Sequence, residues 1–417
     1  MKNIAGIILA AGEGTRMKSS LPKVLHPLCG KPMIRYIVDN LKALGIKKIA
    51  AVVGHKADQV KERLEGVRCV KQNRLLGTGD AVLQTAKIIL QDAKIDTVLI
   101  LYGDTPLLTK ETIKKLIDKH KTTGASCALL TAQLKNPTGY GRIKRNSGGK
   151  IVKIIEEADA SIYDKVIEEI NVGVYCFDKN SLFEALKKIV PDNEKEEYYL
   201  TDTIGIMAKS NLSVESVVTD NMEEFLGVNT RVELAKAESV MRQRVLDKIM
   251  RSGVTVIDPD NTYIEEDVEI GRDTVIYPYT FIESNVKIGS GCSLGPFARL
   301  RTGTTVRDNV GIGNFVEIVR SEIGAGTKIR HQCYIGDTVM GKDVNIGAGT
   351  IVANYDGRKK HETVIEDNAF IGTGSILIAP VKIGKSAVTG AGSVVTKNNN
   401  VPAGKTVVGV PAKILKR

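Results

Sequence analysis

The chain lacks several features that would narrow its class at once. None of its 417 residues is Trp, and it contains seven Phe and five His. No apolar run reaches the length that a transmembrane helix needs. Lys2 is followed directly by a strand pattern and a glycine-rich loop, which is not the pattern of a signal peptide. Neither a membrane span nor a cleaved leader is therefore expected.

Cysteine pairs and nucleic-acid-binding runs are also absent. The six cysteines are scattered and form no Cys-x-x-Cys pair, so free thiols in a reducing cytoplasm are expected. The net charge is +11, but no basic run carries interleaved aromatic residues, so nucleic acid is not expected as a partner. Anionic small substrates would explain the positive charge as easily, and a general surface bias explains it better than either.

The chain does contain a repeat in its C-terminal part. Every sixth residue there is aliphatic, with single-residue slips and one longer interruption. The positions are Ile264, Ile270, Ile276, Ile282, Ile288, Leu294, Leu300, Val306, Ile312, Ile318, Ile323, Ile329, Ile335, Met340, Ile346, Ile365, Ile371, Leu377 and Ile383. A period of six fits neither a helix nor an ordinary strand. It fits a solenoid with three flat faces, in which one aliphatic side chain per hexad points inward and coils stack about 4.8 Å apart.

The N-terminal half alternates between strand and helix patterns. Strands are expected at 4–10, 49–53, 97–101 and 128–132, and helices at 32–44, 57–64, 79–90 and 110–120. This alternation predicts a parallel sheet with helices on both faces. Ligands then bind at the carboxyl ends of the strands, where segments 11–17, 72–78 and 102–104 fall.

The first of these segments is a glycine-rich loop with two possible roles. Gly12 and Gly14 begin a Gly-x-Gly-x-x-Gly pattern, but Met17 occupies its last position, and a Walker sequence is absent. The backbone N–H groups could cradle a phosphate, with Arg16 and Lys23 supplying positive charge. The loop could also be a tight structural turn.

A series of motifs in a fixed order favours the phosphate site. Residues 9–17 with Pro22-Lys23 resemble the signature of sugar nucleotidyltransferases, and the motifs that follow are at 72–81, 101–107, 136–142, 156, 170–173, 197–202 and 227–229. Order and spacing resemble one family over nearly the whole chain, the bifunctional N-acetylglucosamine-1-phosphate uridylyltransferase/glucosamine-1-phosphate acetyltransferases. The resemblance implies a Rossmann-like α/β nucleotidyltransferase domain followed by a left-handed parallel β-helix, and the handedness comes from the resemblance alone.

Three segments are expected on this basis. The nucleotidyltransferase domain would span 1–228, a linker helix 229–253 and the β-helix 254–417. Thr230 and Glu233 have the spacing of a capping box at the start of the linker helix. The apolar stripe of this helix fits internal packing better than a partner site.

Uridylyl transfer explains the first group of candidate residues. A sugar 1-phosphate is already a nucleophile, so the protein must align two anions and neutralise charge, a role that Arg16 and Lys23 fit. Asp104 and Asn229 offer hard oxygen ligands for Mg²⁺. By the resemblance, nucleotide and sugar contacts fall on Leu9, Ala10, Gly12, Gly14, Gln72, Gly77, Thr78, Tyr102, Gly141, Glu156, Asn171 and Asn229.

Each of these residues could also have an ordinary structural role. Asp104 could cap a helix, Asn171 could finish a turn, and Glu156 could be a solvated charge. Their joint occurrence in the order of the family favours the functional interpretation.

Acetyl transfer explains the second group. The amine of glucosamine 1-phosphate must lose a proton before it attacks the thioester of acetyl-CoA, and histidine is the natural base. The resemblance places this base at His331. Further contacts with substrate and coenzyme A fall on Arg301, Tyr334, Asn345, Asn354, Tyr355, Lys360, Thr373 and Ala391. Cys333 could be proposed as an acyl carrier, but acetyl-CoA can be attacked directly.

Two departures from the family concern the acetyl acceptor. Val319 stands where the family has a substrate-binding lysine. Arg320 follows it, but neighbouring residues on a strand point to opposite faces, so it cannot simply substitute. The tail at 401–413 resembles that of generic hexapeptide acyltransferases. The acceptor is therefore open, although coenzyme A binding is little affected.

The resemblance implies a bifunctional enzyme of UDP-N-acetylglucosamine synthesis, on the route to peptidoglycan and lipopolysaccharide. It would transfer acetyl from acetyl-CoA to glucosamine 1-phosphate and then uridylyl from UTP to N-acetylglucosamine 1-phosphate, with Mg²⁺, as a cytoplasmic homotrimer. One alternative is a nucleotidyltransferase for another sugar or nucleotide, such as dTTP, with weak, altered or lost acetyl transfer. Another is a non-catalytic sugar-nucleotide sensor on a trimeric scaffold, which would not need to keep the metal pair Asp104 and Asn229.

Overall fold

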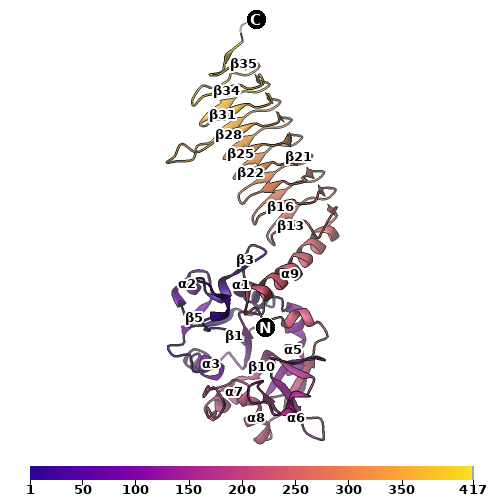
Figure 1. Ribbon diagram of the computed structural model, residues 1–417. Coiled ribbons are helices and arrows are strands. Elements are labelled where there is room, and N and C mark those ends of the chain that lie inside the picture. The colour runs from indigo at the N-terminus through magenta and orange to yellow at the C-terminus, as the bar shows by residue number, and fades with distance from the viewer. Residues whose placement is uncertain (416–417) are drawn as a thin grey trace. The chain divides into compact units, whose positions relative to one another are not determined.

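The chain forms two compact units, and the boundary between them falls within one long helix. The computed structural model describes residues 1–415, so the last two residues of the expected 254–417 segment lie outside the described part. The first unit covers residues 1–240 and the second begins at Met241, within helix α9 (Arg231–Arg251; Figure 1). The predicted capping box precedes this helix. Thr230 Oγ1 accepts a hydrogen bond from the Glu233 N–H at 3.2 Å, and Glu233 Oε2 accepts one from the Thr230 N–H at 2.8 Å.

The first unit is built on a mixed sheet. Its main path runs β11 (Val214–Val218), β7 (Cys127–Gln133), β10 (Glu169–Asp178), β6 (Thr97–Tyr102), β1 (Ile4–Ala10), β4 (Lys48–Val53) and β5 (Arg68–Lys71). The expected parallel sheet was wrong in one respect, because β10 runs antiparallel to both β6 and β7. The chain reaches β10 through the hairpin of β8 (Arg142–Arg145) and β9 (Ile151–Ile155), without a helical crossover between parallel strands. The start of β10 consequently lies at the edge where the parallel strands end.

Helices cover both faces of this sheet. Ile4 and Ile8 of β1 pack against one set of helices, and Ile7 and Leu9 pack against the other. Strand β1 is buried along its whole length, which explains its unbroken apolar sequence. The helices are α1 (Met33–Ala43), α2 (Ala57–Glu62), α3 (Thr78–Leu83), α4 (Ala86–Leu90), α5 (Lys110–Thr123), α6 (Ile162–Lys165), α7 (Lys179–Leu186) and α8 (Asp202–Lys209).

The helix expected over 79–90 is divided in two. Helix α3 ends at Leu83, and α4 begins at Ala86. Between them, Thr85 is buried and its hydroxyl donates to the Val82 carbonyl at 2.7 Å. Such a bond from side chain to backbone competes with helical hydrogen bonding.

The second unit is a left-handed parallel β-helix with three faces, as expected. The first face contains β12 (Thr255–Val256), β15 (Val275–Ile276), β18 (Ser293–Leu294), β21 (Gly311–Asn314), β24 (Lys328–His331), β27 (Asn345–Ile346), β30 (Phe370–Ile371), β33 (Val388–Thr389), β35 (Thr406–Val408) and β36 (Lys413–Ile414). The second contains β13 (Tyr263–Ile264), β16 (Phe281–Ile282), β19 (Arg299–Leu300), β22 (Glu317–Val319), β25 (Tyr334–Gly336), β28 (Ile351–Ala353), β31 (Ile376–Ile378) and β34 (Val394–Val395). The third contains β14 (Glu269–Ile270), β17 (Lys287–Ile288), β20 (Thr305–Val306), β23 (Glu322–Ile323), β26 (Thr338–Met340), β29 (Thr363–Ile365) and β32 (Val381–Ile383).

The inward aliphatic positions form the core of this unit. All the predicted ladder positions are buried except Ile270, which packs against the core but remains partly exposed. Ile270 lies on β14, the first strand of the third face. The interruption after β28 is a loop that projects from the coil (Figure 1) and is closed by a bridge between Tyr355 and Lys360.

Within residues 1–415, none of the helices combines the length and the apolar character that crossing a membrane requires.

Candidate active sites

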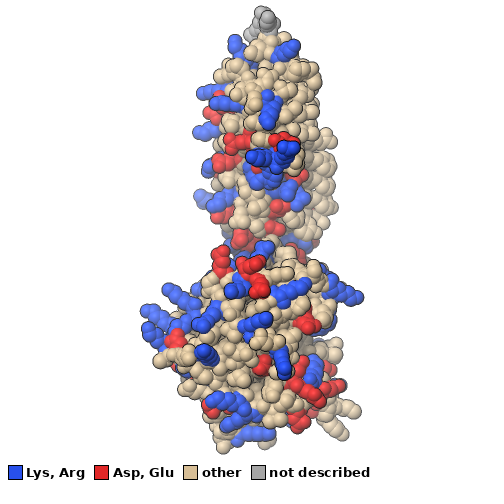
Figure 2. Space-filling view, turned by 90° about the vertical axis from the view of Figure 1, so that its left-hand side faces the viewer, with Lys and Arg blue, Asp and Glu red and all other residues tan. Residues whose placement is uncertain are grey.

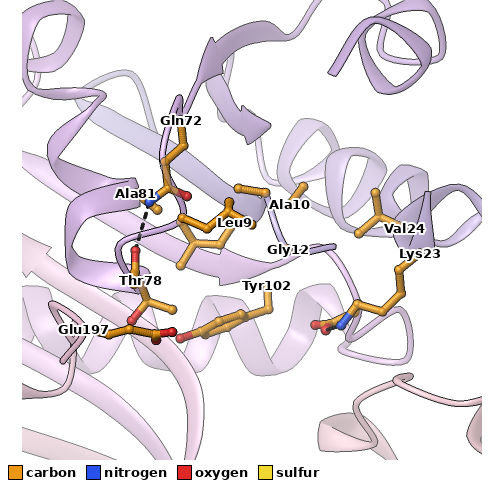
Figure 3. A pocket seen from close by; sticks show the side chains of 14 residues that line it. Leu9, Ala10, Gly12, Lys23, Val24, Gln72, Thr78, Ala81, Tyr102 and Glu197 are labelled. Atoms are coloured by element: carbon orange, nitrogen blue, oxygen red, sulfur yellow. Dashed lines mark hydrogen bonds and ion pairs between the residues drawn. The ribbon is translucent and has the colours of Figure 1, made fainter. Parts of the chain in front are cut away.

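A cavity of about 330 Å³ lies at the carboxyl edge of the first unit's sheet (Figure 3). Many of the expected residues line it: Leu9, Ala10, Gly12, Lys23, Gln72, Gly77, Thr78, Tyr102 and Asp104. They come from the ends of β1 and β6 and from the loops that follow β1 and β5. The cavity is thus built from segments far apart in the sequence, at the edge that the strand pattern predicted.

Two expected residues of the glycine loop lie outside this lining. Gly14 has a positive φ of 63°, and a Cβ on it would lie 2.7 Å from the Lys23 Cβ, so glycine allows Lys23 to pass close to the loop. Arg16 is exposed on the short helical turn Thr15–Met17. Lys23 is therefore the cation placed in the cavity, and Arg16 lies on the surface of the same loop.

Lys23, Asp104 and Asn229 meet beside the cavity. The Lys23 ammonium donates to Asp104 Oδ2 and, at 2.9 Å, to Asn229 Oδ1. The Val228 N–H donates to the Asp104 carbonyl at 2.9 Å, which holds segment 228–229 next to the end of β6. Asp104 does not cap α5, because Thr109 occupies that position. Two side-chain oxygens thus converge on one cation.

The expected sugar residues lie together around Gly141. A Cβ on Gly141 would be 3.6 Å from Asn171 Cβ and 3.6 Å from Glu156 Oε2. The Asn171 N–H also donates to the Gly141 carbonyl at 2.8 Å. Glu156 and Tyr102 line a second cavity of about 480 Å³, which shares Thr78, Tyr102 and Glu197 with the first. Glu156 and Tyr102 therefore line a space that adjoins the first cavity, whereas Gly141 and Asn171 lie next to Glu156 and line neither space.

The hydrogen bonds of Asn171 and Glu156 bear on the alternative structural roles considered for these two residues. Asn171 does not finish a turn: it lies within β10, where the pairing with β7 shifts register, and its Oδ1 accepts from the Gly173 N–H at 3.1 Å. Its Nδ2 donates to the Tyr175 hydroxyl at 2.7 Å. Glu156 is not a freely solvated charge, since its Oε1 accepts from the Thr201 hydroxyl at 2.8 Å.

Burial changes the acidity of the groups around the sugar residues. Burial raises the pKa of Glu156, and the Thr201 hydroxyl opposes this rise. Burial, followed by the charges of Glu156 and Asp159, raises the pKa of Asp202 to about 6. The pKa of Tyr102 is also raised, first by burial and then by Glu156 and Asp104. Raised carboxyl pKa values in a cavity are typical of binding and catalytic sites.

Glu197 and Thr201 were not among the expected site residues, although both lie in the motif at 197–202. Glu197 lines both adjoining cavities, and Thr201 is bonded to Glu156. The motif itself was the available signal. The hydrogen bond between Thr201 and Glu156 could not be predicted from the sequence, because it joins residues that are 45 positions apart.

In the second unit, His331 belongs to a column of corner residues between the first and second faces. The His331 carbonyl accepts from the Gly349 N–H in the next coil, and the chain of bonds continues from Gly374 to Ala348 and from Gly392 to Thr373. The expected residues Thr373 and Ala391 thus lie along the same corner as His331. Asn345 lies on β27 of the first face.

The other expected acetyl-transfer residues lie on the second face or at its far corner. Tyr334 is on β25 of the second face. Arg301 follows β19, where its Nη1 donates to Glu317 Oε1 at 3.0 Å. Asn354 follows β28 and donates to Asp337, and Tyr355 and Lys360 lie in the projecting loop. Within one chain, His331, Thr373 and Ala391 therefore lie at the corner before the second face. Arg301, Asn354, Tyr355 and Lys360 lie at or beyond its far end, and Tyr334 begins β25 between them.

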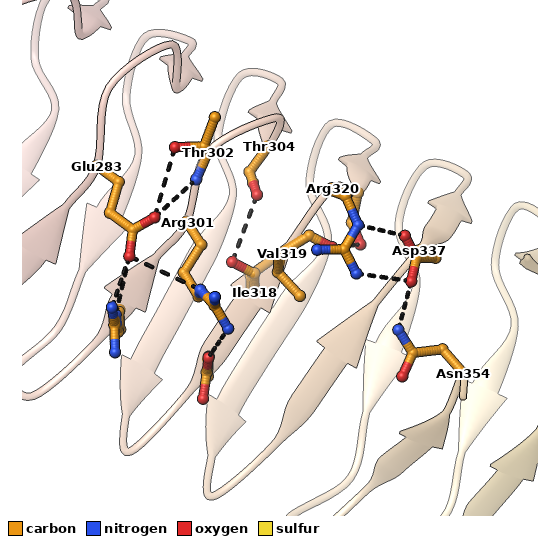
Figure 4. Close-up of polar contacts among 12 residues, drawn as sticks. Glu283, Arg301, Thr302, Thr304, Ile318, Val319, Arg320, Asp337 and Asn354 are labelled. Carbon is orange, nitrogen blue, oxygen red and sulfur yellow. Dashed lines mark hydrogen bonds and ion pairs between the residues drawn. The ribbon is translucent and has the colours of Figure 1, made fainter. Parts of the chain in front are cut away.

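The position that departs from the family is fully apolar here. Val319 is 2% exposed, at the last position of β22. Arg320 is turned to Asp337, with Nε to Oδ1 at 2.6 Å and Nη2 to Oδ2 at 2.8 Å (Figure 4). Strand alternation does not describe this pair, because Arg320 has a φ of 46° and stands at the corner. Its guanidinium is nevertheless held by Asp337, so it does not take the place of a free lysine.

Cys333 does not have the properties of an acyl carrier. Its side chain points into the coil, where the thiol donates to the His331 carbonyl at 2.9 Å, and burial raises its pKa. A nucleophilic cysteine needs access and a lowered pKa.

Comparisons with known proteins cover nearly the whole chain. The family model for MobA-like NTP transferase domains matches residues 6–195, that for GMPPB C-terminal domains matches 259–356, and that for bacterial transferase hexapeptides (six repeats) matches 362–397. A relative from Shouchella clausii named bifunctional protein GlmU is 46% identical, over 95% of this chain and 94% of the relative. Relatives of the same name from Geobacillus thermodenitrificans and Pseudothermotoga lettingae are 45% and 46% identical, over 97% and 95% of this chain and 94% of each relative.

Proposed function

The chain belongs to the family of the bifunctional GlmU proteins, and we propose that its two units carry out two successive transfers. Acetyl passes from acetyl-CoA to glucosamine 1-phosphate, and uridylyl then passes from UTP to N-acetylglucosamine 1-phosphate with release of pyrophosphate. Residues 1–228 perform the uridylyl transfer, the segment from 254 onwards performs the acetyl transfer, and 229–253 joins them. The observation that carries the proposal is the convergence of Lys23, Asp104 and Asn229 beside the first cavity.

In the uridylyl transfer, a phosphate oxygen of the sugar attacks the α-phosphorus of UTP. Since this oxygen is already a nucleophile, no protein base is required. The nucleotide lies along Leu9, Gln72 and Thr78, and the sugar lies between Gly141, Glu156 and Asn171. Lys23, and Arg16 from its loop, offset the negative charge that collects on the departing pyrophosphate.

Asp104 and Asn229 fit a magnesium ion. Both oxygens already converge on the Lys23 ammonium, so a single cation can reach both. Within the described part of the chain, no three His, Cys, Asp or Glu side chains cluster as a metal cage would require. Mg²⁺ accepts such a sparse pair because it keeps water and substrate phosphate in its coordination sphere. When bound, it would neutralise phosphate charge.

Pyrophosphate release tests the first activity. With UTP and N-acetylglucosamine 1-phosphate, the purified protein should release pyrophosphate, and a chelator should stop this release while CoA release continues. Added Mg²⁺ should restore it. If release persists in the chelator, Asp104 and Asn229 do not hold a required metal. If dTTP is used as well as UTP, the protein acts on a broader set of nucleotides.

In the acetyl transfer, His331 takes one proton of the sugar ammonium. The freed amine attacks the acetyl carbon, so a C–N bond forms and the C–S bond breaks. The nitrogen then loses a second proton to become a neutral amide, and the departing CoA thiolate takes up this proton. Arg301, Tyr334, Asn354, Tyr355 and Lys360 bind the acceptor side. Asn345, Thr373 and Ala391 lie toward coenzyme A.

A homotrimer is the oligomer that we propose. At the corner between the first and second faces, the rings of Tyr279, Phe297 and Phe315 stack with centroids 4.8 and 5.3 Å apart, and they are 52%, 46% and 57% exposed. The third face instead presents charged residues such as Glu269 and Lys287, and charged rows cover part of the β-helix surface in Figure 2. A second copy at the aromatic corner would bring its own second-face residues to His331.

A charge in the aromatic corner should break the trimer. We expect Phe297→Glu to weaken association by about 30-fold or more, since losing a buried aromatic anchor costs about 2 kcal/mol or more. Acetyl transfer should fall with it, whereas uridylyl transfer should persist. Light scattering would give the particle mass. Val339→Glu, on the third face, is the matched control and should stay trimeric; a single-chain mass for the unaltered protein would refute the proposal.

The compartment follows from the substrates. UTP and acetyl-CoA are cytoplasmic metabolites, and none of the six cysteines, which all lie in the described part of the chain, forms a disulfide, so we assign the protein to the cytoplasm.

A further inference from the structure

Thr201 stands at the N-cap of α8 but does not cap the helix. Threonine at this position normally accepts a hydrogen bond from one of the first free N–H groups of the helix. Here the side chain makes no capping bond. Its hydroxyl instead donates to Glu156 Oε1 at 2.8 Å, and the residue is 3% exposed. The backbone of Thr201 is already helical, with φ −60° and ψ −25°, and its hydroxyl contacts the Glu156 carboxylate.

The segment just before Thr201 is hydrogen-bonded to residues 72–79, which we call the nucleotide loop and which include the first two residues of α3. The Tyr198 N–H donates to the Leu76 carbonyl at 2.8 Å, and the Gly79 N–H donates back to the Tyr198 carbonyl at 2.7 Å. The Leu200 N–H donates to Thr78 Oγ1 at 3.0 Å. These three bonds attach residues 198–200 along the length of the loop.

Glycines in the loop permit this close approach. A Cβ on Gly77 would lie 2.6 Å from the Tyr198 carbonyl oxygen, and one on Gly79 would lie 2.9 Å from the same atom. Both contacts are shorter than real Cβ atoms tolerate, so larger residues would push the two segments apart. The nucleotide loop and the segment at 198–201 are therefore packed tightly against each other and should move together.

We propose that Thr201 is a positioning residue that couples the sugar subsite to the nucleotide loop. This inference rests on the proposed uridylyl transfer. The Thr201 hydroxyl fixes one oxygen of Glu156 and leaves Oε2 on the side of Gly141, where the sugar binds. Since residues 198–200 move with the nucleotide loop, an ordered loop also holds Glu156 in its binding orientation.

The same contact affects ionisation. Glu156 accepts sugar hydroxyls best as a carboxylate, and the Thr201 hydroxyl lowers its pKa against the effect of burial. Losing the hydroxyl should raise the pKa of Glu156 further, so the acidic limb of kcat/KM for the sugar phosphate should shift to higher pH. The charged and titratable neighbours that stay in place are Asp159, Lys195, Asp202, Tyr102, Tyr175 and Tyr199.

Three variants test the proposal through pyrophosphate release. Thr201→Val keeps the shape and removes the hydroxyl. It should raise KM for N-acetylglucosamine 1-phosphate by about 10- to 100-fold, the weight of a hydrogen bond to a charged group, while KM for UTP changes little. Thr201→Ser should restore the KM. Thr203→Val is the matched control, because Thr203 is buried in the same helix and its hydroxyl donates to the Leu200 carbonyl, at 2.6 Å.

The outcomes separate this inference from the proposed function. If the unaltered protein releases no pyrophosphate from these substrates, the proposed function fails first. If it does, but Thr201→Val and Thr203→Val change both KM values alike, Thr201 has only a structural role. Unaltered kinetics and an unshifted acidic limb in Thr201→Val would also overturn the proposal.

Discussion

Replacing Asp104 with alanine is expected to lower the rate of pyrophosphate release by about 10³-fold. Asp104 is the only carboxylate of the proposed metal pair, and without it the Lys23 ammonium loses its charged partner. Acetyl transfer should be unchanged, because the proposed acetyl-transfer residues all lie in the second unit. The rates of pyrophosphate and CoA release, measured on the same preparation, would check both expectations.

Two further variants serve as controls for this result. Asp104→Asn keeps the shape of the side chain but removes the charge. Its rate of pyrophosphate release should be nearly as low as that of Asp104→Ala. Asp118→Ala removes an exposed carboxylate of α5 that pairs with Lys114, and it should behave like the unaltered protein. An equal loss of both activities in Asp104→Ala would show that the two units do not work independently.

Replacing His331 with alanine is expected to lower kcat for acetyl transfer by about 10²- to 10⁴-fold, the usual contribution of a general base. KM for acetyl-CoA should change little, because the base acts on the amine and not on the thioester. The remaining rate should rise steeply with pH, since the amine then loses its proton to solvent. A pH profile of CoA release would show this.

The second histidine of the β-helix provides the comparison. His361 lies in the projecting loop, where its Nε2 is 2.6 Å from Asp356 Oδ2. His361→Ala should lower acetyl transfer far less than His331→Ala. If His331→Ala retains its rate, the base lies elsewhere and the corner column of His331, Thr373 and Ala391 needs another role.

The periodic parts of the fold could be predicted because the residue type at each position of the repeat indicates whether that position is buried. Ile312 and its equivalents recur at every coil, so the inward ladder could be read residue by residue. The antiparallel direction of β10 could not, because a buried strand has the same composition in either direction. The break at Thr85 was hidden for a similar reason: it depends on one side-chain bond to Val82.

The candidate sites divide in the same way. Lys23, Asp104 and Asn229 were expected together from ordered motifs. In the structure, Asp104 and Asn229 both accept hydrogen bonds from the Lys23 ammonium. Thr201 was missed because its partner, Glu156, is distant in the sequence and the contact exists only in the folded chain. Arg320 could be named but not placed, because its pairing with Asp337 depends on the corner between two coils.

The acetyl acceptor is the point on which the bifunctional account depends most. Val319 is a buried apolar side chain where the resemblance implies a lysine, and Arg320 is paired with Asp337. The decisive measurement is CoA release from acetyl-CoA and glucosamine 1-phosphate, without UTP. The account predicts a signal that requires the acceptor and disappears in His331→Ala. No signal, beside normal pyrophosphate release from UTP and N-acetylglucosamine 1-phosphate, would contradict it and leave a uridylyltransferase whose β-helix serves another acceptor.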